Sequence, residues 1–300
     1  MQPDAHPDLT AVADGVALHG PGAGVLDLAE RAVEFYAARY GDHPPRVLAA
    51  EVARCRSQLI DGSATSTEVR RVVGWLSGLL GNLAHHTGDV PASLIHFGTA
   101  ARVGEELGEH RLAGWALGAQ SMVVMAQDRH REALELADQA EEFADDALRR
   151  AQITAWCRLR PLAALGDRAR LDEAVTLARR YMDTADREEP GRFGFDRAEF
   201  HQHLAEALVR HDPVEAARHA ETSIGLKRAG SPGWAAATAI LARTHVARRD
   251  ALGATALGMS VLETVPDGCL RANTRTRLLR LVADLEGRHG AAELADALGT

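Results

Sequence analysis

Apolar and polar residues follow the spacing of amphipathic helices from Val25 to the end of the chain. Apolar positions recur about every 3.6 residues, alanine, leucine, arginine and glutamate dominate, and the alternation typical of β-strands is scarce. Short breaks separate the apolar stripes: DHPP, DGSATS, TGDVP, REEPG, GSPG and PDG. The pattern predicts an all-α protein of about fourteen helices, most of them about 14 to 20 residues long.

Several of these breaks carry residues typical of a helix start. In three places a capping oxygen precedes an acidic residue by three positions, as in a capping box: Thr65 with Glu68, Asp196 with Glu199, and Asp212 with Glu215. Pro213 and Pro232 fit the first helical position, where the missing amide hydrogen is not needed. We therefore expect helices to begin at these points.

The turns between helices repeat at a nearly constant interval. Their aspartates lie 39, 39, 45 and 38 residues apart, at Asp89, Asp128, Asp167, Asp212 and Asp250. A small residue follows each turn, at Ser93, Ala133, Ala174, Ala216 and Ala254, and Trp75, Trp115 and Trp156 share the same step. Helix pairs that recur in this way bury their apolar faces only against their neighbours. We predict an α-solenoid of stacked antiparallel helix pairs with a period of about 40 residues.

The repeats also set the expected domain boundaries. Residues 1–24 end in GPGAG and lack sustained periodicity, which predicts a flexible N-terminal tail, and residues 25–300 form the predicted solenoid domain. The chain does not begin like a secretory signal, and its longest nearly apolar run, Leu112–Ala126, is shorter than the roughly 20 residues that span a bilayer. We expect a cytoplasmic protein that makes no membrane contact.

Charge and cysteine content narrow the classes of partner. The net charge of −8 gives no basic surplus for binding a phosphate backbone, so direct contact with nucleic acid is not expected. Cys55, Cys157 and Cys269 are odd in number and far apart, which fits neither a disulfide framework nor a paired metal or redox motif. We expect three reduced thiols that serve as small core residues.

One stretch resembles a tetratricopeptide unit. In GNLAHHTGDVPASLIHFGTA, residues 81–100, Gly81 stands at the helix-packing glycine, Gly88 at the turn and Ser93 at the small position, with Phe97 and Ala100 following. Later units, such as REALELADQA and LDEAVTLARR, keep only the small-residue pattern of the second helix. The resemblance implies degenerate or extended repeats.

A longer region resembles the carboxy-terminal sensor region of actinobacterial helix-turn-helix transcriptional regulators. The resemblance runs over about residues 25–285, from RAVEFYAARYGDHPPRVLAAEVARCRSQLIDG through RRVVGWLSGLLGNLAHHTGD and WALGAQSM to GRFGFD. Such regulators carry a DNA-reading domain ahead of the repeats, and 24 residues cannot hold one. We therefore expect either a free-standing relative or a truncated regulator, with any transcriptional role exerted through another protein.

The stretch GRFGFDRAEFHQH, residues 191–203, gathers aromatic and histidine side chains at one helix start. With Asp196 as the cap, Phe195 and Phe200 occupy the two positions of a hydrophobic staple. Phe193 either packs against the stack or covers a groove as a lid. His201 falls on the apolar face of the helix, as a hydrogen-bonded core residue or a ligand contact, whereas His203 points the opposite way and is expected in solvent.

Candidate ligand-binding residues lie on the predicted first helices of the pairs. Aromatic side chains there either stack on a ligand or pack between helices: Trp75, Trp115 and Trp156. Asn82 and Gln120 lie within otherwise apolar helices, where an amide needs an inter-helix hydrogen bond or reads a ligand. Together with Phe193 and His201, these five residues form the predicted site.

Two further patterns bear on packing and on metals. Gly74, Gly78 and Gly81, then Gly114 and Gly118, recur three or four residues apart, which predicts close approach between helices. His85 and His86 at a helix end and the acidic run 141–146 lack the spacing of a metal site. No nucleotide-binding or paired-carboxylate motif occurs, and we expect neither a metal nor a cofactor.

These observations favour a non-enzymatic recognition module. We expect it to bind a peptide, a partner protein or a small-molecule effector in a groove, with a regulatory role and with a homodimer left open. The first alternative is a cofactor-independent enzyme or accessory protein of specialised metabolism in which His201 acts as acid or base. It ranks second because the spacing supplies no partner to orient His201. The second alternative is a scaffold without a pocket.

Overall fold

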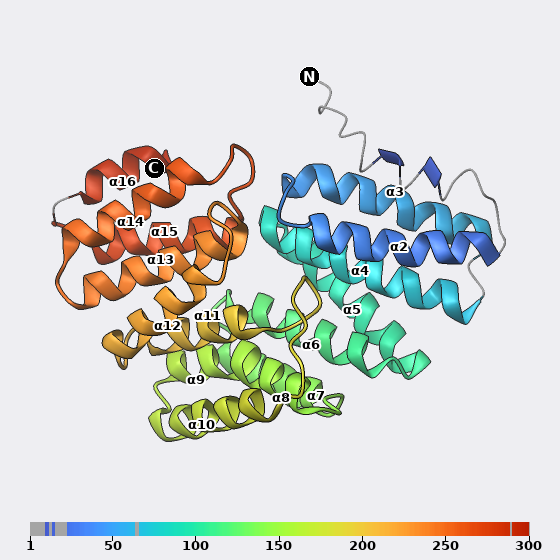
Figure 1. Cartoon of the computed structure of the whole chain (residues 1–300), viewed down its shortest axis with the longest axis horizontal. Coiled ribbons are helices and arrows are strands. Elements are labelled where there is room, and N and C mark those ends of the chain that lie inside the picture. Colours follow the sequence, from blue (N-terminus) through green and yellow to red (C-terminus); the bar gives the residue numbers. More distant parts are fainter. Residues whose placement is uncertain (1–9, 12–13, 16–22, 64–65, 289, 300) are drawn as a thin grey trace. The chain divides into compact units, whose positions relative to one another are not determined.

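The computed structural model describes residues 10–11, 14–15, 23–63, 66–288 and 290–299 (Figure 1). Within these ranges the regular elements are helices that pack in succession, and no β-strand occurs among them. The predicted all-α stack of helix pairs is thereby confirmed. Most of the predicted tail, residues 1–24, lies outside the described residues.

The chain divides into two compact units. Unit 1 comprises the residues up to Asp145 together with Gly191–Phe193, and unit 2 comprises Asp146–Pro190 and Gly194–Thr300. The helices of unit 1 are α2 (Ala23–Arg39), α3 (Pro45–Ser63), α4 (Thr67–Thr87), α5 (Val90–Leu107), α6 (His110–Met125) and α7 (His130–Glu141).

Unit 2 begins with one continuous helix whose middle is a π-helical turn, η1. Its elements are α8 (Ala147–Ile153), η1 (Thr154–Arg158), α9 (Leu159–Leu165), α10 (Arg168–Thr184), α11 (Arg197–Leu208), α12 (Pro213–Gly225), α13 (Pro232–Ala247), α14 (Ala251–Thr264), α15 (Ala272–Asp284) and α16 (Ala291–Leu298). Helices α9, α11, α13 and α15 are the first members of their pairs, and each contacts the next. We call these four helices the first-helix layer.

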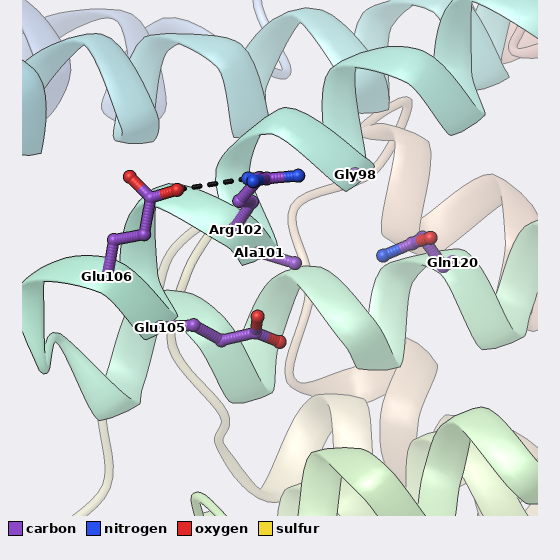
Figure 2. A pocket seen from close by; sticks show the side chains of 6 residues that line it. All are labelled: Gly98, Ala101, Arg102, Glu105, Glu106 and Gln120. Atoms are coloured by element: carbon purple, nitrogen blue, oxygen red, sulfur yellow. Dashed lines mark hydrogen bonds and ion pairs between the residues drawn. The ribbon is translucent and has the colours of Figure 1, made fainter.

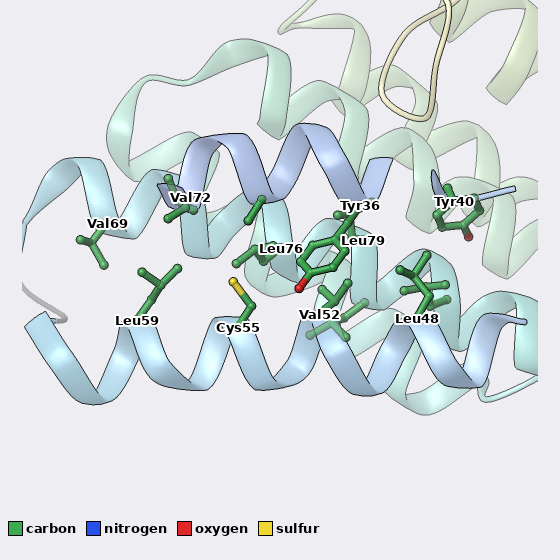
Figure 3. Packing of buried hydrophobic residues seen from close by; sticks show 14 residues of the cluster. Tyr36, Tyr40, Leu48, Val52, Cys55, Leu59, Val69, Val72, Leu76 and Leu79 are labelled. Carbon is green, nitrogen blue, oxygen red and sulfur yellow. The ribbon is translucent and has the colours of Figure 1, made fainter. Parts of the chain in front are cut away.

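The core of unit 1 begins where α2, α3 and α4 meet (Figure 3). Tyr36 of α2 is fully buried against Leu48 and Val52 of α3, while α4 contributes Leu76 and Leu79. Cys55 lies in the same cluster. It is buried and forms no disulfide, and the same holds for Cys157 and Cys269 elsewhere in the chain. The expected role of the three cysteines as small core residues is confirmed.

Glycines bring neighbouring helices of unit 1 into close contact. A Cβ atom on Gly74 would lie 2.7 Å from Leu112 Cδ2, and one on Gly81 would lie 2.7 Å from Phe97 Cδ1. Both distances are too short for ordinary contacts between carbon atoms. The close approach predicted from the glycine spacing is confirmed, and it offsets the cost of glycine within a helix.

The repeated turns begin helices in a similar way in both units. Four of the five turn aspartates accept a hydrogen bond from a backbone N–H as the N-cap of the next helix: Asp89, Asp167, Asp212 and Asp250. The fifth, Asp128, adopts a left-handed conformation with φ of 60°. All five predicted small positions are buried, and the Ser93 hydroxyl donates to the Gly81 carbonyl oxygen at 2.8 Å, which ties α5 to α4.

The predicted helix starts are correct at three of four places. Asp196 and Asp212 accept the N–H groups of Glu199 and Glu215, both at 2.9 Å, and α13 begins at Pro232 as expected. At the fourth place the prediction is wrong by one residue. The cap of α4 is Ser66, whose hydroxyl accepts from Val69 N at 3.2 Å, because the helix starts at residue 67; Thr65 lies outside the described residues.

None of the described helices is both long enough and apolar enough to cross a membrane.

Candidate functional site

Three of the predicted site residues meet in unit 1 as an aromatic cluster. The ring of Phe193 lies 4.5 Å from the ring of Trp75 and 4.8 Å from the ring of Trp115, centroid to centroid, and is edge-on to both. Phe97 adds a further edge contact to Trp115 at 5.8 Å. Such contacts contribute about 0.5–1.5 kcal/mol per pair beyond the burial of area.

Packing explains most of this cluster. Trp115 is only 3% exposed, and its Cζ3 atom would lie 2.9 Å from a Cβ on Gly78, so the glycine makes room for the indole ring. Trp75 is partly exposed, with the Arg111 guanidinium 5.9 Å from the centre of its ring. Among the alternatives that the sequence leaves open, Trp115 and Phe193 therefore show packing contacts, and Trp75 keeps a partly open face.

The two predicted amides lie in different surroundings. Asn82 of α4 is 6% exposed, and its Nδ2 atom has no hydrogen-bond partner among the described residues. Gln120 of α6 is partly exposed and lines a shallow pocket (Figure 2). The inter-helix hydrogen bond expected for the Asn82 amide nitrogen is thus not made within the described chain.

The pocket beside Gln120 is open, and most of its lining residues carry polar or charged side chains. Its volume is about 380 Å³, and its lining residues are Gly98, Ala101, Arg102, Glu105, Glu106 and Gln120. Arg102 donates to Glu106 at 3.0 Å, so its charge is already paired within the wall of the pocket (Figure 2). Openness and internal pairing favour water over a tightly held ligand, because polar groups in a ligand site usually converge on an enclosed space.

His201 pairs with a histidine that is not evident from the sequence. Its Nδ1 atom lies 2.7 Å from Nδ1 of His219 on α12, so one ring donates its N–H to the other, and the rings stack at 4.9 Å. Nε2 of His219 lies 3.6 Å from the Glu215 carboxylate. Burial, and then the neighbouring His219, lowers the pKa of His201 to about 4, so the ring is neutral at neutral pH.

The expectation that His203 is solvated is wrong. It is 5% exposed, its ring stacks on Phe195 at 6.4 Å, and its Nε2 atom lies 3.7 Å from the Glu199 carboxylate. The side chain is buried because α11 contacts α9, α12 and α13, so a residue opposite the first apolar face meets another helix instead of water. Burial lowers the pKa of His203 to about 4.

The predicted staple at the start of α11 is confirmed. Phe195 and Phe200 are both buried, with ring centroids 6.5 Å apart and the rings nearly perpendicular. A β-bridge between Glu189 and Phe195 closes the loop before α11. Gly194 is required there because a Cβ atom would lie 1.8 Å from the Glu189 carbonyl oxygen.

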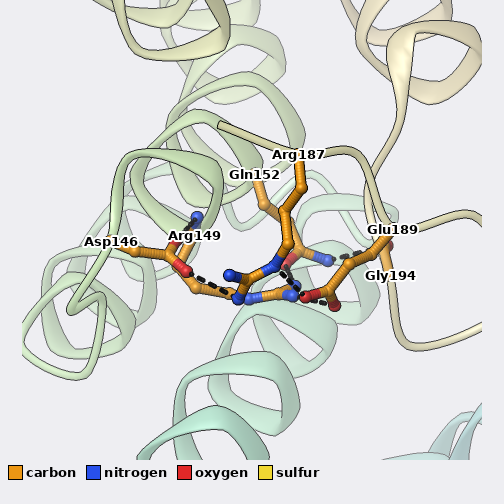
Figure 4. Close-up of polar contacts among 6 residues, drawn as sticks. All are labelled: Asp146, Arg149, Gln152, Arg187, Glu189 and Gly194. Carbon is orange, nitrogen blue, oxygen red and sulfur yellow. Dashed lines mark hydrogen bonds and ion pairs between the residues drawn. The ribbon is translucent and has the colours of Figure 1, made fainter. Parts of the chain in front are cut away.

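Helix α8 holds this loop through polar side chains (Figure 4). The Gln152 side chain donates to the Gly194 carbonyl oxygen at 3.1 Å and accepts from Arg149 at 2.7 Å. Arg149 also pairs with the Glu189 carboxylate, and Arg187 donates to Glu189 at 3.1 Å. These contacts fix the position from which α11 starts.

Trp156 lies in unit 2, within the π-helical turn, and is partly exposed. A π-turn inserts an extra residue into a helix and rotates everything that follows, and such turns are frequent at functional sites. The turn thus changes the direction in which α9 presents its side chains.

A buried ionic cluster lies directly beyond that turn. Arg277 of α15 grips Glu206 of α11 with two hydrogen bonds, from Nε to Oε1 at 2.9 Å and from Nη2 to Oε2 at 2.8 Å. Arg160 of α9 approaches the same carboxylate, with Nε 3.3 Å from Oε2. The three side chains are only 8%, 7% and 11% exposed, respectively. We call them the ionic cluster.

The pKa of Glu206 shows how strongly the cluster is coupled. Burial alone raises the pKa of this carboxyl, but the charges of Arg160 and Arg277 and the hydrogen bonds from Arg277 more than offset that effect. The net result holds the pKa of Glu206 well below its usual range. The carboxylate is therefore charged throughout the physiological range.

Sequence patterns give only a weak signal for this cluster. Glu206 interrupts the apolar run HLAEALV, and Arg277 lies within TRTRLLRLV, but both also fit an ordinary solvated helix face. The partners are 46 and 71 residues from Glu206 in the chain, and no local rule connects them.

Among the described residues, no group of three histidine, cysteine, aspartate or glutamate side chains is placed to hold a metal ion.

No protein-family model matches this chain, and no curated protein matches it either. Its function is therefore inferred from its own residues and their geometry.

Proposed function

We propose that this protein is a regulatory recognition module of the tetratricopeptide type, which binds a peptide, a partner protein or a small effector through the first-helix layer of unit 2. The resemblance to sensor regions of transcriptional regulators supports a role exerted through another protein. We further propose that it acts in the cytoplasm, where buried thiols such as Cys157 stay reduced.

The observation that carries this proposal is the ionic cluster. Removing charged groups from water costs several kcal/mol per ion, and mutual attraction in the interior often only balances that cost. Replacing such a buried ionic group by apolar side chains of similar volume is often neutral or stabilising. The charged side chains of the ionic cluster join α9, α11 and α15. Because packing alone does not require charges there, we attribute them to the binding of a ligand.

Neighbouring polar groups extend the same surface. Gln202 of α11 is buried and accepts from Lys227 Nζ at 2.6 Å, and Lys227 also pairs with Glu199 at 2.9 Å. Together with His203, these side chains make the α11 face that borders the ionic cluster unusually polar for a packed helix. Polar side chains that hold one another in position are preorganised for specific contacts with a ligand.

A paired stability and binding experiment tests the proposal. An array of synthetic peptides and a panel of carboxylate, phosphate, amine and neutral metabolites is screened against the wild type and against Arg160→Met/Glu206→Leu/Arg277→Met. We expect the triple variant to melt at the same or a higher temperature and to lose a ligand that the wild type binds. If it retains that ligand, or if the wild type binds nothing, a scaffold becomes the better explanation.

The hydrogen bond between His201 and His219 favours a second candidate, an acid–base enzyme. His219, backed by Glu215, supplies the orienting partner that the sequence does not reveal. A base with a pKa of about 4 is weak at neutral pH, so this candidate ranks below recognition. It would move ahead if His201→Ala abolished turnover in a panel of ester, amide and phosphate-ester substrates while leaving the melting curve unchanged.

A further inference from the structure

The loop between α10 and α11 contributes a short stretch to unit 1. Gly191–Phe193 belongs to unit 1, whereas the residues on either side of it belong to unit 2. The β-bridge between Glu189 and Phe195 closes the loop just outside this stretch. The loop therefore carries one arginine and one phenylalanine at its tip, and we call Gly191–Phe193 the tip segment.

The phenylalanine of the tip segment lies among aromatic rings of α4 and α6. The ring of Phe193 is edge-on to those of Trp75 and Trp115. A Cβ atom on Gly78 would lie 3.7 Å from its Cε1 atom, so the ring also covers the glycine at ordinary contact distance. Phe193 and Trp75 are both partly exposed, so this aromatic cluster reaches the surface of unit 1.

The arginine of the tip segment lies on a different ring. Cζ of Arg192 is 5.2 Å from the centre of the Tyr40 ring, and a guanidinium over an aromatic face is attracted to it. The Tyr40 ring in turn lies edge-on to His86 of α4, at 5.7 Å. Two successive side chains of the tip segment thus contact two separate aromatic positions, as the side chains of a bound peptide do.

An unsatisfied amide lies between these two contacts. Gly78, Asn82 and His86 follow one another at steps of four residues, which places them on one stripe of α4. Asn82 is 6% exposed, and its Nδ2 atom has no hydrogen-bond partner among the described residues. A buried donor without an acceptor is costly. The tip segment therefore matches the shape of this stripe but leaves its hydrogen bonding incomplete.

We propose that the face of unit 1 formed by Tyr40, Trp75 and Trp115 binds an extended peptide in which a basic residue directly precedes an aromatic one. The tip segment occupies this aromatic face until such a peptide displaces it. The aromatic ring of the peptide replaces that of Phe193, and its basic side chain lies on Tyr40. The site lies within unit 1, so it adds a second, self-occupied site to the proposed function and does not depend on the ionic cluster.

The incoming peptide has one advantage over the tip segment. The bridge between Glu189 and Phe195 fixes the backbone of the loop, and no carbonyl group of the loop accepts from Asn82 Nδ2. A free peptide is not held in this way, so one of its carbonyl groups turns toward Asn82 and accepts the missing hydrogen bond.

The tip segment has the advantage of being attached to the chain. A group on a short link acts at an effective concentration in the millimolar range, so it competes strongly with a free peptide. Removal of the Phe193 ring should therefore open the aromatic face to a peptide that the wild type binds only weakly.

Fluorescence anisotropy with a labelled peptide of residues 189–195, EPGRFGF, tests the inference. We expect Phe193→Ala to bind this peptide at least about tenfold more tightly than the wild type, because the ring no longer competes. The peptide EPGRAGF should bind Phe193→Ala at least about tenfold more weakly, because it lacks the aromatic anchor. Circular dichroism checks the fold of each variant, and Arg192→Ala provides a milder opening of the aromatic face at Tyr40.

Phe35→Ala is the matched control, because it removes another partly exposed ring of unit 1 that lies beside an arginine, Arg39. It should bind EPGRFGF as weakly as the wild type does. Equal binding by Phe35→Ala and Phe193→Ala would overturn the inference, as would equal binding of EPGRFGF and EPGRAGF.

A second substitution tests the role of the buried amide. Asn82→Leu, added to Phe193→Ala, should weaken binding of EPGRFGF by at least about tenfold, because the peptide carbonyl loses its donor. The melting temperature should stay the same or rise, since the substitution removes an unsatisfied donor from the interior. A lower melting temperature with unchanged peptide binding would show that Asn82 serves packing and would contradict the proposed contact.

Discussion

The first helices of unit 1 and unit 2 fill their contacts with different chemistry. In α4 and α6 of unit 1, glycines and aromatic rings interlock, as where Trp115 lies against Gly78. In α11 and α15 of unit 2, contacts between the helices include charged side chains, as where Arg277 donates two hydrogen bonds to Glu206. Both units follow the same plan of helix pairs with capped turns.

The difference shows which contacts the plan requires. Stacked helix pairs need small residues where the helices approach closely and apolar faces elsewhere. Unit 1 satisfies this requirement because its glycines and aromatic rings have complementary shapes. Unit 2 also has an apolar core, around Ala205, Leu208 and Ile240, and places charges beside it at an energetic cost. A cost that packing does not explain points to function in unit 2.

The largest expected effect comes from breaking the ionic cluster on one side. Arg277→Met leaves the buried Glu206 carboxylate with Arg160 as its remaining arginine partner, and we expect a loss of about 3–5 kcal/mol in the free energy of unfolding. Urea denaturation measures it. The triple apolar variant should recover the stability that Arg277→Met loses. A loss well below this range for Arg277→Met would show that Glu206 is better solvated than its burial implies.

The second largest expected effect is a loss of stability of unit 2 at acidic pH. The folded pKa of His203 is about 4 and its ordinary pKa is 6.5, so the unfolded chain binds the proton first as pH falls. The contribution of neutral His203 is complete above pH 6.5 and is lost below it, by about 3 kcal/mol at pH 4. The free energy of unfolding, measured by urea denaturation at several values between pH 7 and pH 4, should therefore fall less with decreasing pH for His203→Gln than for the wild type.

Shape complementarity in unit 1 is tested by a pair of glycines. Gly78→Leu should cost about 2 kcal/mol, because the new side chain starts 2.9 Å from Trp115. Gly98→Ala on α5 meets nothing within 4 Å and should stabilise by up to about 1 kcal/mol through helix propensity. Thermal melts compare them, and equal effects at the two sites would contradict close packing at Gly78.

The smallest effect concerns the start of α11. Asp196→Ala removes the oxygen that accepts the Glu199 N–H, and we expect a loss of about 1 kcal/mol in stability. Asp196→Asn keeps an acceptor oxygen and should retain most of the stability. If both variants unfold alike in urea, the carboxylate charge matters more than the cap.

Local signals account for what the sequence predicted correctly. Proline and aspartate at Asp212 and Pro213 mark a helix start through backbone rules that act within four residues. Small residues at a fixed step, such as Ser93 and Ala133, mark helix crossings because only they fit there. The aromatic and glycine periods of unit 1 are of the same kind, so its packing was largely foreseeable.

The misplaced and missed residues depend on distant parts of the chain. His203 was expected in solvent because one helix has two faces, but α11 is covered on more than one side. His219 orients His201 from the next helix, and the partners of Glu206 come from two others. Periodicity gives a side chain's direction on its own helix and is silent about what it meets.

The sequence by itself determined that this chain is all-α, where its turns fall, and which small residues lie between helices, because capping and steric fit act over a few residues. Only the tertiary structure decided that Arg160 and Arg277 share the buried carboxylate of Glu206. Charge pairing depends on distances in space, and those are set only when helices far apart in the sequence pack together.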